Sequence, residues 1–188
     1  MKKLYFLLLI CISFSALAQT YTYTTYNTSN SAIGSNYIAD IKTDTNGLLW
    51  LATYNGVSSF NGTAFTNYNT ANSGIASNAT LKIEIDGQNR KWIASQFNGI
   101  ILYNGTGWTN YTTSNSGLPS NEIIDIAVDG QNNLWVVTPA GLTKFNGTTW
   151  TTYNSVSNLN SVATDSNNGI WVTNGEYYTN LMVLILIL

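Results

Sequence analysis

Histidine is absent from the 188 residues, and cysteine occurs once, at Cys11. The missing histidine removes the commonest general base and the commonest metal ligand. Cys11 lies in an apolar N-terminal stretch, so the remainder of the chain has no disulfide bond, thiol nucleophile or thiolate ligand. We therefore predict no catalytic residues, no metal site and no cofactor, and we expect the protein not to be an enzyme.

Charge is also scarce, since only 9% of the residues are charged. Beyond the N-terminal stretch the chain has nine acidic residues and five basic ones, which are Lys42, Lys82, Arg90, Lys91 and Lys144. No basic patch could neutralise phosphates, so we expect no nucleic acid partner. Asn, Thr, Ser and Gly are abundant and aromatic residues reach 13%. Such a polar, nearly uncharged surface suits hydrogen bonding and ring stacking.

The N-terminus has the features of a secretory signal peptide. Lys2 and Lys3 precede an apolar stretch, residues 4–12, and the small residues Ala16 and Ala18 precede Gln19. An apolar stretch of this length is too short to span a bilayer. We predict that residues 1–18 are a signal peptide cleaved near Ala18/Gln19, that the protein is secreted or periplasmic, and that no membrane span remains after cleavage.

The chain is repetitive. An Asp is followed six residues later by a Trp four times, and the tryptophans recur at intervals of 42, 43 and 36 residues. A period in this range indicates one supersecondary module copied in tandem. The repeat markers are Asp44, Trp50, Asp86, Trp92, Asp129, Trp135, Asp165 and Trp171.

Each unit has four strand signals separated by turn residues. In the third copy these are residues 123–128, 134–138, 142–145 and 149–153, and the first two copies repeat the order. Asn146-Gly147 predicts a two-residue hairpin with positive φ at both central positions. A repeated four-stranded antiparallel meander is typical of a β-propeller blade. A β-helix is the alternative, but its rungs are shorter and would not need Asn-Gly hairpins.

We expect an all-β fold with a β-propeller-like array over residues 19–180, in units 27–68, 69–111, 112–153 and 154–178. That gives about three complete blades and a partial fourth. Tyr23 and Tyr26 align with Trp108 and Tyr111 of a fourth strand, so the N-terminal strand could complete the last blade and close the ring. The apolar tail, residues 181–188, is either the end of a truncated or frame-shifted longer array or a closing strand.

The third unit carries a family resemblance. Residues 118–129 (LPSNEIIDIAVD), followed by 133–138 (NLWVVT), Phe145-Asn146-Gly147 and 150–153 (WTTY), resemble a two-component regulator propeller repeat. The resemblance covers about residues 21–173 and implies a sensor-like, extracytoplasmic β-propeller. Family sensors carry more blades, a membrane helix and kinase modules. These are missing here, so we expect no signalling output to be encoded in this chain.

The recurring polar and aromatic residues have structural interpretations. We expect each motif Asp to cap an Asx-type turn, each motif Trp to lie in the core, and the fourth-strand aromatic residues to pack between blades. Asp40 and Asp125 occupy matching positions on first strands. Paired carboxylates can hydrolyse glycosides, but these two lie two blades apart, so we expect them to be a solvated lining of the central channel.

Residues that differ between copies in matching loops are better ligand candidates. The loops between strands two and three, and between strand four and the next blade, should share one face of a propeller. The ligand-binding candidates are Tyr54, Asn55, Gln96, Phe97, Asn98, Asn121 and Glu122, with Asn36, Tyr37, Asn78 and Pro139 on the same face.

The leading function is an exported, non-enzymatic module that binds a glycan, another envelope or extracellular ligand, or a protein partner on this face. One alternative is a surface assembly protein that associates with itself through the open edges of its propeller. Another is a hydrolase or lyase acting on polysaccharide, which the missing histidine disfavours. A non-functional fragment is the last alternative.

Overall fold

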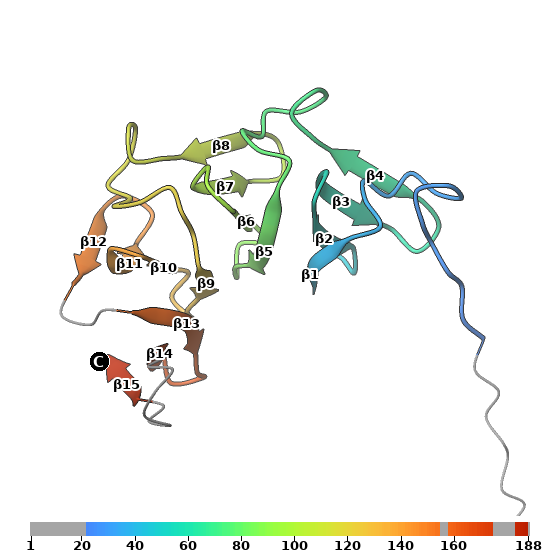
Figure 1. The fold of residues 1–188 in the computed structure, drawn as a ribbon. Coiled ribbons are helices and arrows are strands. Elements are labelled where there is room, and N and C mark those ends of the chain that lie inside the picture. The colour runs from blue at the N-terminus through green and yellow to red at the C-terminus, as the bar shows by residue number, and fades with distance from the viewer. Residues whose placement is uncertain (1–21, 155–157, 175–182, 188) are drawn as a thin grey trace, which may run out of the picture.

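The computed structural model describes residues 22–154, 158–174 and 183–187, which form strands and loops. Four antiparallel sheets follow one another along the chain (Figure 1). The first two sheets contain β1 (Ile38–Thr43), β2 (Leu49–Thr53), β3 (Gly56–Phe60) and β4 (Phe65–Tyr68), then β5 (Thr80–Ile85), β6 (Lys91–Ser95), β7 (Ile100–Tyr103) and β8 (Trp108–Tyr111). The last two contain β9 (Asp125–Val128), β10 (Leu134–Thr138), β11 (Gly141–Phe145) and β12 (Trp150–Tyr153), then β13 (Leu159–Thr164), β14 (Ile170–Asn174) and β15 (Val183–Ile187).

The sheets stand side by side in an open arc, as blades of a β-propeller do (Figure 1). The first strand of each sheet, β1, β5, β9 or β13, lies on the concave side, and β4, β8 and β12 lie on the outside. Within each sheet the strands pair in sequence order, so each is a meander. The expected all-β, four-stranded unit is confirmed, with strand ends within two residues of those predicted.

Apolar residues on both faces of each sheet fill the spaces between sheets. Trp50, Ala52 and Val57 of the first sheet pack against Ile83, Ile93 and Ile101 of the second. Similar clusters join the second sheet to the third and the third to the fourth. Trp50, Trp92 and Trp135 are 3%, 1% and 4% exposed, so these motif tryptophans lie in the core as expected.

Each motif Asp holds its turn and its tryptophan together. One carboxylate oxygen of Asp86 accepts hydrogen bonds from the backbone N–H groups of Gln88 and Arg90, at 3.0 and 2.9 Å. The other accepts the indole N–H of Trp92 at 2.9 Å. The other three copies repeat this arrangement, at Asp44, Asp129 and Asp165. The predicted Asx-type turns are confirmed, and the bond to the indole also fixes the orientation of the ring.

The predicted hairpin geometry is wrong in detail. Gly62 has a φ of 95°, and its equivalents in the next two sheets, Gly105 and Gly147, have a φ of 98°, whereas the preceding asparagines do not have positive φ. The Asn61 side-chain oxygen accepts the backbone N–H groups of Thr63 and Ala64 at 3.0 and 2.9 Å. The central pair of the turn is therefore Gly-Thr. Asn61 precedes that pair, because its side chain bonds the backbone across the turn.

The two ends of the arc do not meet in this structure. Residues 22–26 form no strand and lie at the far end of the arc from β13–β15 (Figure 1). The N-terminal segment, which the sequence allowed as a closing strand, therefore does not close the ring in this structure. Residues 183–187 of the apolar tail form β15, which pairs antiparallel with β14. The predicted signal peptide and its cleavage site lie outside the described residues, as do residues 175–182. Within the described part of the chain, no helix has the length and apolarity to cross a membrane.

Removing one motif carboxylate should destabilise the fold. We expect Asp86→Ala to lower the free energy of unfolding by about 3 kcal/mol, because two backbone N–H groups and the buried indole of Trp92 lose their acceptor. Urea denaturation followed by tryptophan fluorescence measures this. Glu122→Ala, which removes an exposed carboxylate, is the matched control and should change the free energy by less than about 0.5 kcal/mol. An equal effect of the two variants would contradict the role of Asp86.

The same motif predicts a loss of stability in acid. Burial opposes ionisation of Asp44 and Asp129, but hydrogen bonds from Lys91 and Asn133, respectively, and from each turn outweigh it and lower the pKa of each carboxyl. Asp165, bonded to the indole of its own motif, also has a lowered pKa. A lowered pKa in the folded state stabilises the fold above the ordinary carboxyl pKa, and this contribution disappears as the pH falls through the lowered value.

We therefore expect the free energy of unfolding to fall as the pH is reduced below about 4. Urea titrations at a series of pH values measure the slope. Asp129→Asn should be less stable at neutral pH and should lose less stability on acidification than the wild type. An Asp129→Asn profile parallel to that of the wild type would show that this carboxyl does not contribute.

Candidate functional site

The loops between the second and third strands of each sheet have fixed bases. The hydroxyl of Thr53 donates to the carbonyl of Gly56 at 2.8 Å, and Ser95 and Thr138 bond Gly99 and Gly141 in the same way. Gly56 has a φ of 89°, and a Cβ there would lie 2.0 Å from the carbonyl oxygen of Tyr68. Glycine is therefore required at this position, and the variable tips of these loops project from a constant base.

These loops share one face with the segments that lead into the first strands, as the sequence predicts. The backbone N–H of Gly56 donates to the carbonyl of Asn78 at 2.7 Å, and that of Gly99 donates to Asn121 at 2.9 Å. Each bond joins one sheet to the segment that begins the next. We call this surface the loop face; it comprises residues 33–37, 54–55, 75–79, 96–98, 118–122 and 139–140.

Three large aromatic side chains are exposed on the loop face. Tyr37 and Tyr54 are 54% and 49% exposed, and their ring centroids lie 4.0 Å apart at an interplanar angle of 32°. The neighbouring hydroxyl of Tyr37 raises the pKa of Tyr54. Phe97, 61% exposed, lies in the β6–β7 loop, where three residues separate Ser95 from Gly99 and the counterparts have two between the matching positions. The structure thus brings Tyr37 and Tyr54 together as a pair, from segments 17 residues apart in the sequence.

The other predicted ligand-binding residues divide into exposed and structural ones. Gln96 and Asn98 are exposed beside Phe97, and Pro139 is exposed in the matching loop. Asn55 is exposed, but its side-chain N–H group donates to the carbonyl of Gly34 at 3.0 Å. Glu122 is exposed, and its carboxylate has no hydrogen bond or ion pair to the described residues.

Asn121 has a structural role. Its side-chain oxygen accepts the backbone N–H of Thr113 at 2.8 Å, and Asn36 and Asn78 bond Thr28 and Thr70 identically. The three asparagines therefore close the same nine-residue loop before each first strand. Because the carbonyl end of the amide is already used, Asn121 is a poor ligand-binding residue.

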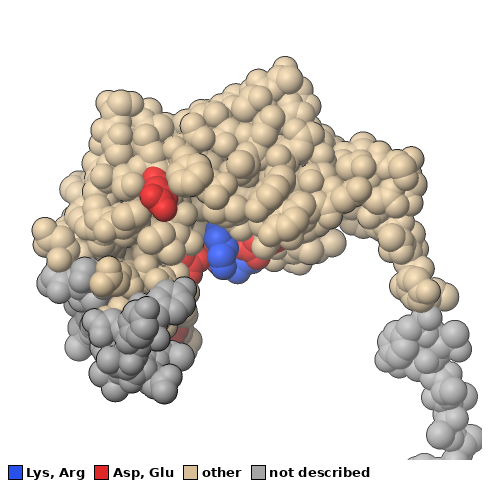
Figure 2. All heavy atoms as spheres, viewed as in Figure 1, with Lys and Arg blue, Asp and Glu red and all other residues tan. Residues whose placement is uncertain are grey.

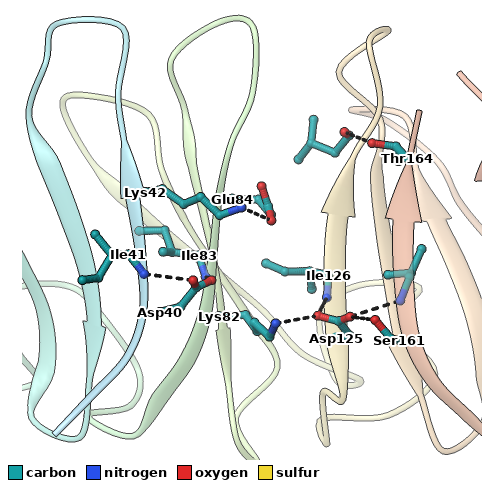
Figure 3. A network of polar contacts seen from close by, with 12 residues as sticks. Asp40, Ile41, Lys42, Lys82, Ile83, Glu84, Asp125, Ile126, Ser161 and Thr164 are labelled. Carbon is teal, nitrogen blue, oxygen red and sulfur yellow. Dashed lines mark hydrogen bonds and ion pairs between the residues drawn. The ribbon is translucent and has the colours of Figure 1, made fainter. Parts of the chain in front are cut away.

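Most of the surface in Figure 2 is uncharged; a group of basic and acidic residues lies on the concave side of the arc, and an acidic residue lies apart from it on the front face. One row is formed by matching positions on β1, β5, β9 and β13, which we call the inner row: Asp40, Lys82, Asp125 and Ser161 (Figure 3). Asp40 accepts the backbone N–H of Ile83 at 3.1 Å, so it joins the first sheet to the second.

Asp125 continues this row across the last three sheets. Lys82 lies 3.4 Å from one of its oxygens, and the other oxygen accepts bonds from the Ser161 hydroxyl at 2.6 Å and the Val162 backbone N–H at 3.1 Å (Figure 3). The oxygen next to Lys82 also accepts the backbone N–H of Ile126, at 3.0 Å. The expected solvated channel lining is therefore wrong for Asp125, which is 6% exposed. Its oxygens are occupied by bonds that hold neighbouring sheets together.

A second ion pair lies two residues further along the first strands. The Lys42 ammonium is 2.7 Å from the Glu84 carboxylate (Figure 3). Burial raises the pKa of Glu84 in spite of the lysine, with a smaller contribution from the negative charges of Asp40 and Asp125. Glu84 therefore favours the fold most when it is protonated, and this contribution is lost as the pH rises through its raised pKa. The pair joins sheets one and two.

All five basic residues of the described chain are engaged by the fold. Lys42 and Lys82 form the ion pairs of the concave side. The other three lie over motif tryptophans, with the cation 5.0–5.3 Å from the ring centroid. The pairs are Lys91 over Trp50, Arg90 over Trp92 and Lys144 over Trp135. Lys91 also forms a buried ion pair with Asp44 at 2.9 Å.

The cleft between the last two sheets is small. A cleft of about 200 Å³ lies between the third and fourth sheets, next to Trp135, Lys144 and Asn168. Ligand pockets usually exceed about 300 Å³. No group of three or more potential metal-ligating side chains occurs within the part of the chain that the structure describes. The loop face, with its exposed aromatic rings, is therefore the best candidate for a functional site.

Comparison with solved structures supports the fold. The chain matches the extracellular domain of a protein described as a hybrid two component system, from B. thetaiotaomicron, with a TM-score of 0.69 and 23% identity over 83% of this chain and 23% of that one. It matches the extracellular domain of a protein described as a one component system, from the same organism, with a TM-score of 0.63 and 21% identity over 81% of this chain and 25% of that one.

A propeller enzyme is similar in fold as well. Catalytically inactive virginiamycin B lyase from Staphylococcus aureus, a His-to-Ala variant bound to quinupristin, matches with a TM-score of 0.62 and 15% identity over 86% of this chain and 58% of that one. The chain thus spans about a quarter of the length of the two extracellular domains. Identities this low show the fold alone.

The family comparison rests on the third unit. No curated protein matches the chain. Residues 117–140 match the model of the family described as "Two component regulator propeller". This segment includes β9, the Asp129–Trp135 turn and β10, which are part of the stretch that carried the resemblance. The chain is therefore a β-propeller protein that carries the two-component regulator propeller repeat.

Proposed function

We propose that this chain is an exported, non-enzymatic recognition module that binds a glycan on its loop face. The observation that carries the proposal is the exposed Tyr37–Tyr54 pair, with Phe97 on the same face. Large exposed aromatic rings stack on apolar ligand surfaces, and here they project from loops whose bases are fixed by the sheets. The tips differ between copies, whereas the bases are the same.

The chemistry of the face favours a neutral ligand that carries hydroxyl groups. The exposed amides of Gln96 and Asn98 beside Phe97 can donate and accept hydrogen bonds. Glu122 supplies a single negative charge, and the basic residues of the described chain are engaged elsewhere. A sugar combines an apolar ring face with hydroxyl groups and so matches both features. A protein partner could use the same rings, and the binding experiment below distinguishes the two.

Two observations support a non-enzymatic role. The carboxylates that matched a glycosidase pair in sequence, Asp40 and Asp125, bond backbone N–H groups of neighbouring sheets, and Asp125 is almost fully buried. The similar lyase is described as catalytically inactive when a histidine is replaced by alanine, and this chain contains no histidine. The similar extracellular domains of two component and one component systems add support for a sensor-like binding role outside the cytoplasm.

Truncating the exposed rings should weaken binding. We expect the protein to bind neutral oligosaccharides on a glycan array. In isothermal titration calorimetry, Tyr54→Ala and Phe97→Ala should each raise the Kd of the best-bound oligosaccharide about tenfold, because stacking is lost. Thr148→Ala, in an exposed hairpin outside the loop face, is the control and should bind as the wild type does.

The outcomes separate the alternatives. The ligand would be a protein, not a glycan, if the chain binds no oligosaccharide but captures a protein and Tyr54→Ala abolishes that capture. Cleavage of a bound polysaccharide that Asp125→Asn abolishes would show an enzyme and overturn the proposal. Thermal unfolding of each variant shows that the loss of binding is not a loss of folding.

Export can be tested independently of binding. We expect the protein expressed in a Gram-negative host to be recovered from the periplasm or medium with Gln19 as its first residue, because Ala16 and Ala18 fit the small-residue positions of a signal peptidase site. N-terminal sequencing measures this. Replacing both alanines, Ala16→Leu with Ala18→Leu, should leave residues 1–18 attached. A chain retained uncleaved in the cytoplasm would contradict the predicted signal peptide.

A further inference from the structure

The first sheet has one face that no other sheet covers. At matching positions on the first strands, Ile83, Ile126 and Val162 are 0%, 2% and 6% exposed, because each packs against the preceding sheet. Ile41, at the same position on β1, is 52% exposed. The exposed Ile41 therefore marks a docking surface that has the apolar character of the three internal interfaces.

The fourth sheet shows the complementary situation. Trp50, Trp92 and Trp135 are buried because the following sheet covers each of them. Trp171 makes the same hydrogen bond to its motif Asp, at 2.8 Å, yet remains partly exposed. At one end of the arc, the face of the first sheet that carries Ile41 has, within the described residues, no tryptophan of a preceding sheet packed on it. At the other end, Trp171 of the fourth sheet is only partly covered.

The N-terminal segment marks where the missing neighbour of the first sheet would lie. The Asn30 side chain donates to the carbonyl of Thr25 at 2.9 Å, as Asn72 does to Asn67 and Asn115 to Asn110. Asn67 and Asn110 lie in the outer strands β4 and β8. Residues 23–26 (YTTY) therefore occupy the place of an outer strand of a sheet that precedes β1–β4.

The packing of Tyr26 confirms this equivalence. Its ring lies 5.1 and 5.3 Å from Phe60 and Phe65 of the first sheet. Tyr111, the last residue of β8, contacts Phe145 and Trp150 of the next sheet in the same way. Residues 23–26 thus lie in front of the first sheet in the position of an outer strand, and within the described residues no other strand of such a sheet lies there.

The fourth sheet needs such a strand. Within the described residues it has three strands, β13, β14 and β15, where the other sheets have four. An open β15 edge presents unpaired backbone groups that an added strand can pair with. The two ends of one chain do not meet in this structure (Figure 1), and a second copy carries both a matching sheet and a matching strand.

We propose that two copies of this chain assemble head to tail, with the β13–β15 sheet of one copy docked on the β1–β4 sheet of the other. Residues 22–26 then serve as the fourth strand of the docked sheet. Ile41 enters the new interface, and Trp171 of the second copy is covered as the other motif tryptophans are. Because one chain carries both halves of the contact, two copies close into a ring of eight sheets, within the range known for propellers.

The internal interfaces predict individual contacts in the new one. The inner row would continue from Ser161 of the second copy to Asp40, as Asp125 contacts Ser161 at 2.6 Å inside the chain. Leu49 would cover Trp171 of the second copy, since Lys91 covers Trp50 from the equivalent position. These contacts permit a direct test with introduced cysteines, because the chain apart from Cys11 contains none.

The test uses the exported chain in a Cys11→Ser background. Asp40→Cys and Ser161→Cys are made in separate chains, mixed in equal amounts and oxidised in air with a copper catalyst. We expect a disulfide-linked pair that contains one of each chain, because side chains at these positions should be in contact. Asp40→Cys mixed with Thr148→Cys, a cysteine in an exposed hairpin, is the matched control and should give little such product.

Mass in solution completes the experiment. Sedimentation equilibrium should give the mass of two chains, and Ile41→Glu should give one chain that still unfolds cooperatively, since the exposed Ile41 contributes little to the isolated fold. Phe97→Glu, on the loop face, should leave the pair intact. A monomeric wild type would overturn the proposal in favour of an open monomer. A single chain that carries both Asp40→Cys and Ser161→Cys and forms its disulfide only within itself would overturn it in favour of a self-closed monomer. A series of larger assemblies would overturn closure in pairs.

Discussion

Each sheet of this protein is apolar on both faces, and this constraint decides much of the rest of the structure. A sheet with one solvated face would alternate apolar and polar residues, whereas β6 and β10 are buried at every position. Burial of both faces requires a neighbour on each side, so the sheets stack in a series. Each internal sheet of the series has a neighbour on both faces, but an open arc leaves one face of each end sheet uncovered.

The small number of charged residues follows from the same constraint. A buried charge is costly unless it is paired, and most of the basic side chains lie at the junctions between sheets. Lys42, Lys82 and Lys91 each contact a carboxylate of the neighbouring sheet. The charges therefore connect the sheets and leave little to attract a charged partner. Recognition on the loop face must then depend on aromatic rings and amides.

The sequence predicts the sheets well because their signals are local. Each unit is defined by the Asp-to-Trp spacing, by the turn residues between strand signals and by the repeat period, and none of these depends on a neighbouring unit. The observed strand ends lie within two residues of the predicted ones. The hairpin was mispredicted because the Asn61 side chain competes with the backbone for the turn hydrogen bonds. That competition depends on a side-chain orientation that composition alone does not reveal.

The candidate site is less predictable because its contacts join different sheets. Asp125 appeared to be a solvated carboxylate, yet its partners Ser161 and Val162 come from the next sheet. The face that carries Tyr54 and Phe97 could be deduced from the order of the strands. The tilted contact between the rings of Tyr37 and Tyr54 depends on how the segment before β1 packs against the β2–β3 loop, and no local signal specifies this. The one feature of the sequence that pointed to this face was the difference between copies in the residues at the loop tips.

Assembly and recognition use separate parts of the molecule. The end faces with Ile41 and Trp171 lie on the sheets, whereas the exposed rings of Tyr54 and Phe97 lie on loops that take no part in stacking. In the proposed ring a two-fold axis runs through the centre, so the loop faces of both copies point to the same side. A polymeric ligand could then contact both faces at once, and the second contact would be intramolecular, which strengthens binding without any new residue. Closing the ring would thus serve both the stability of the end sheets and the recognition of an extended glycan.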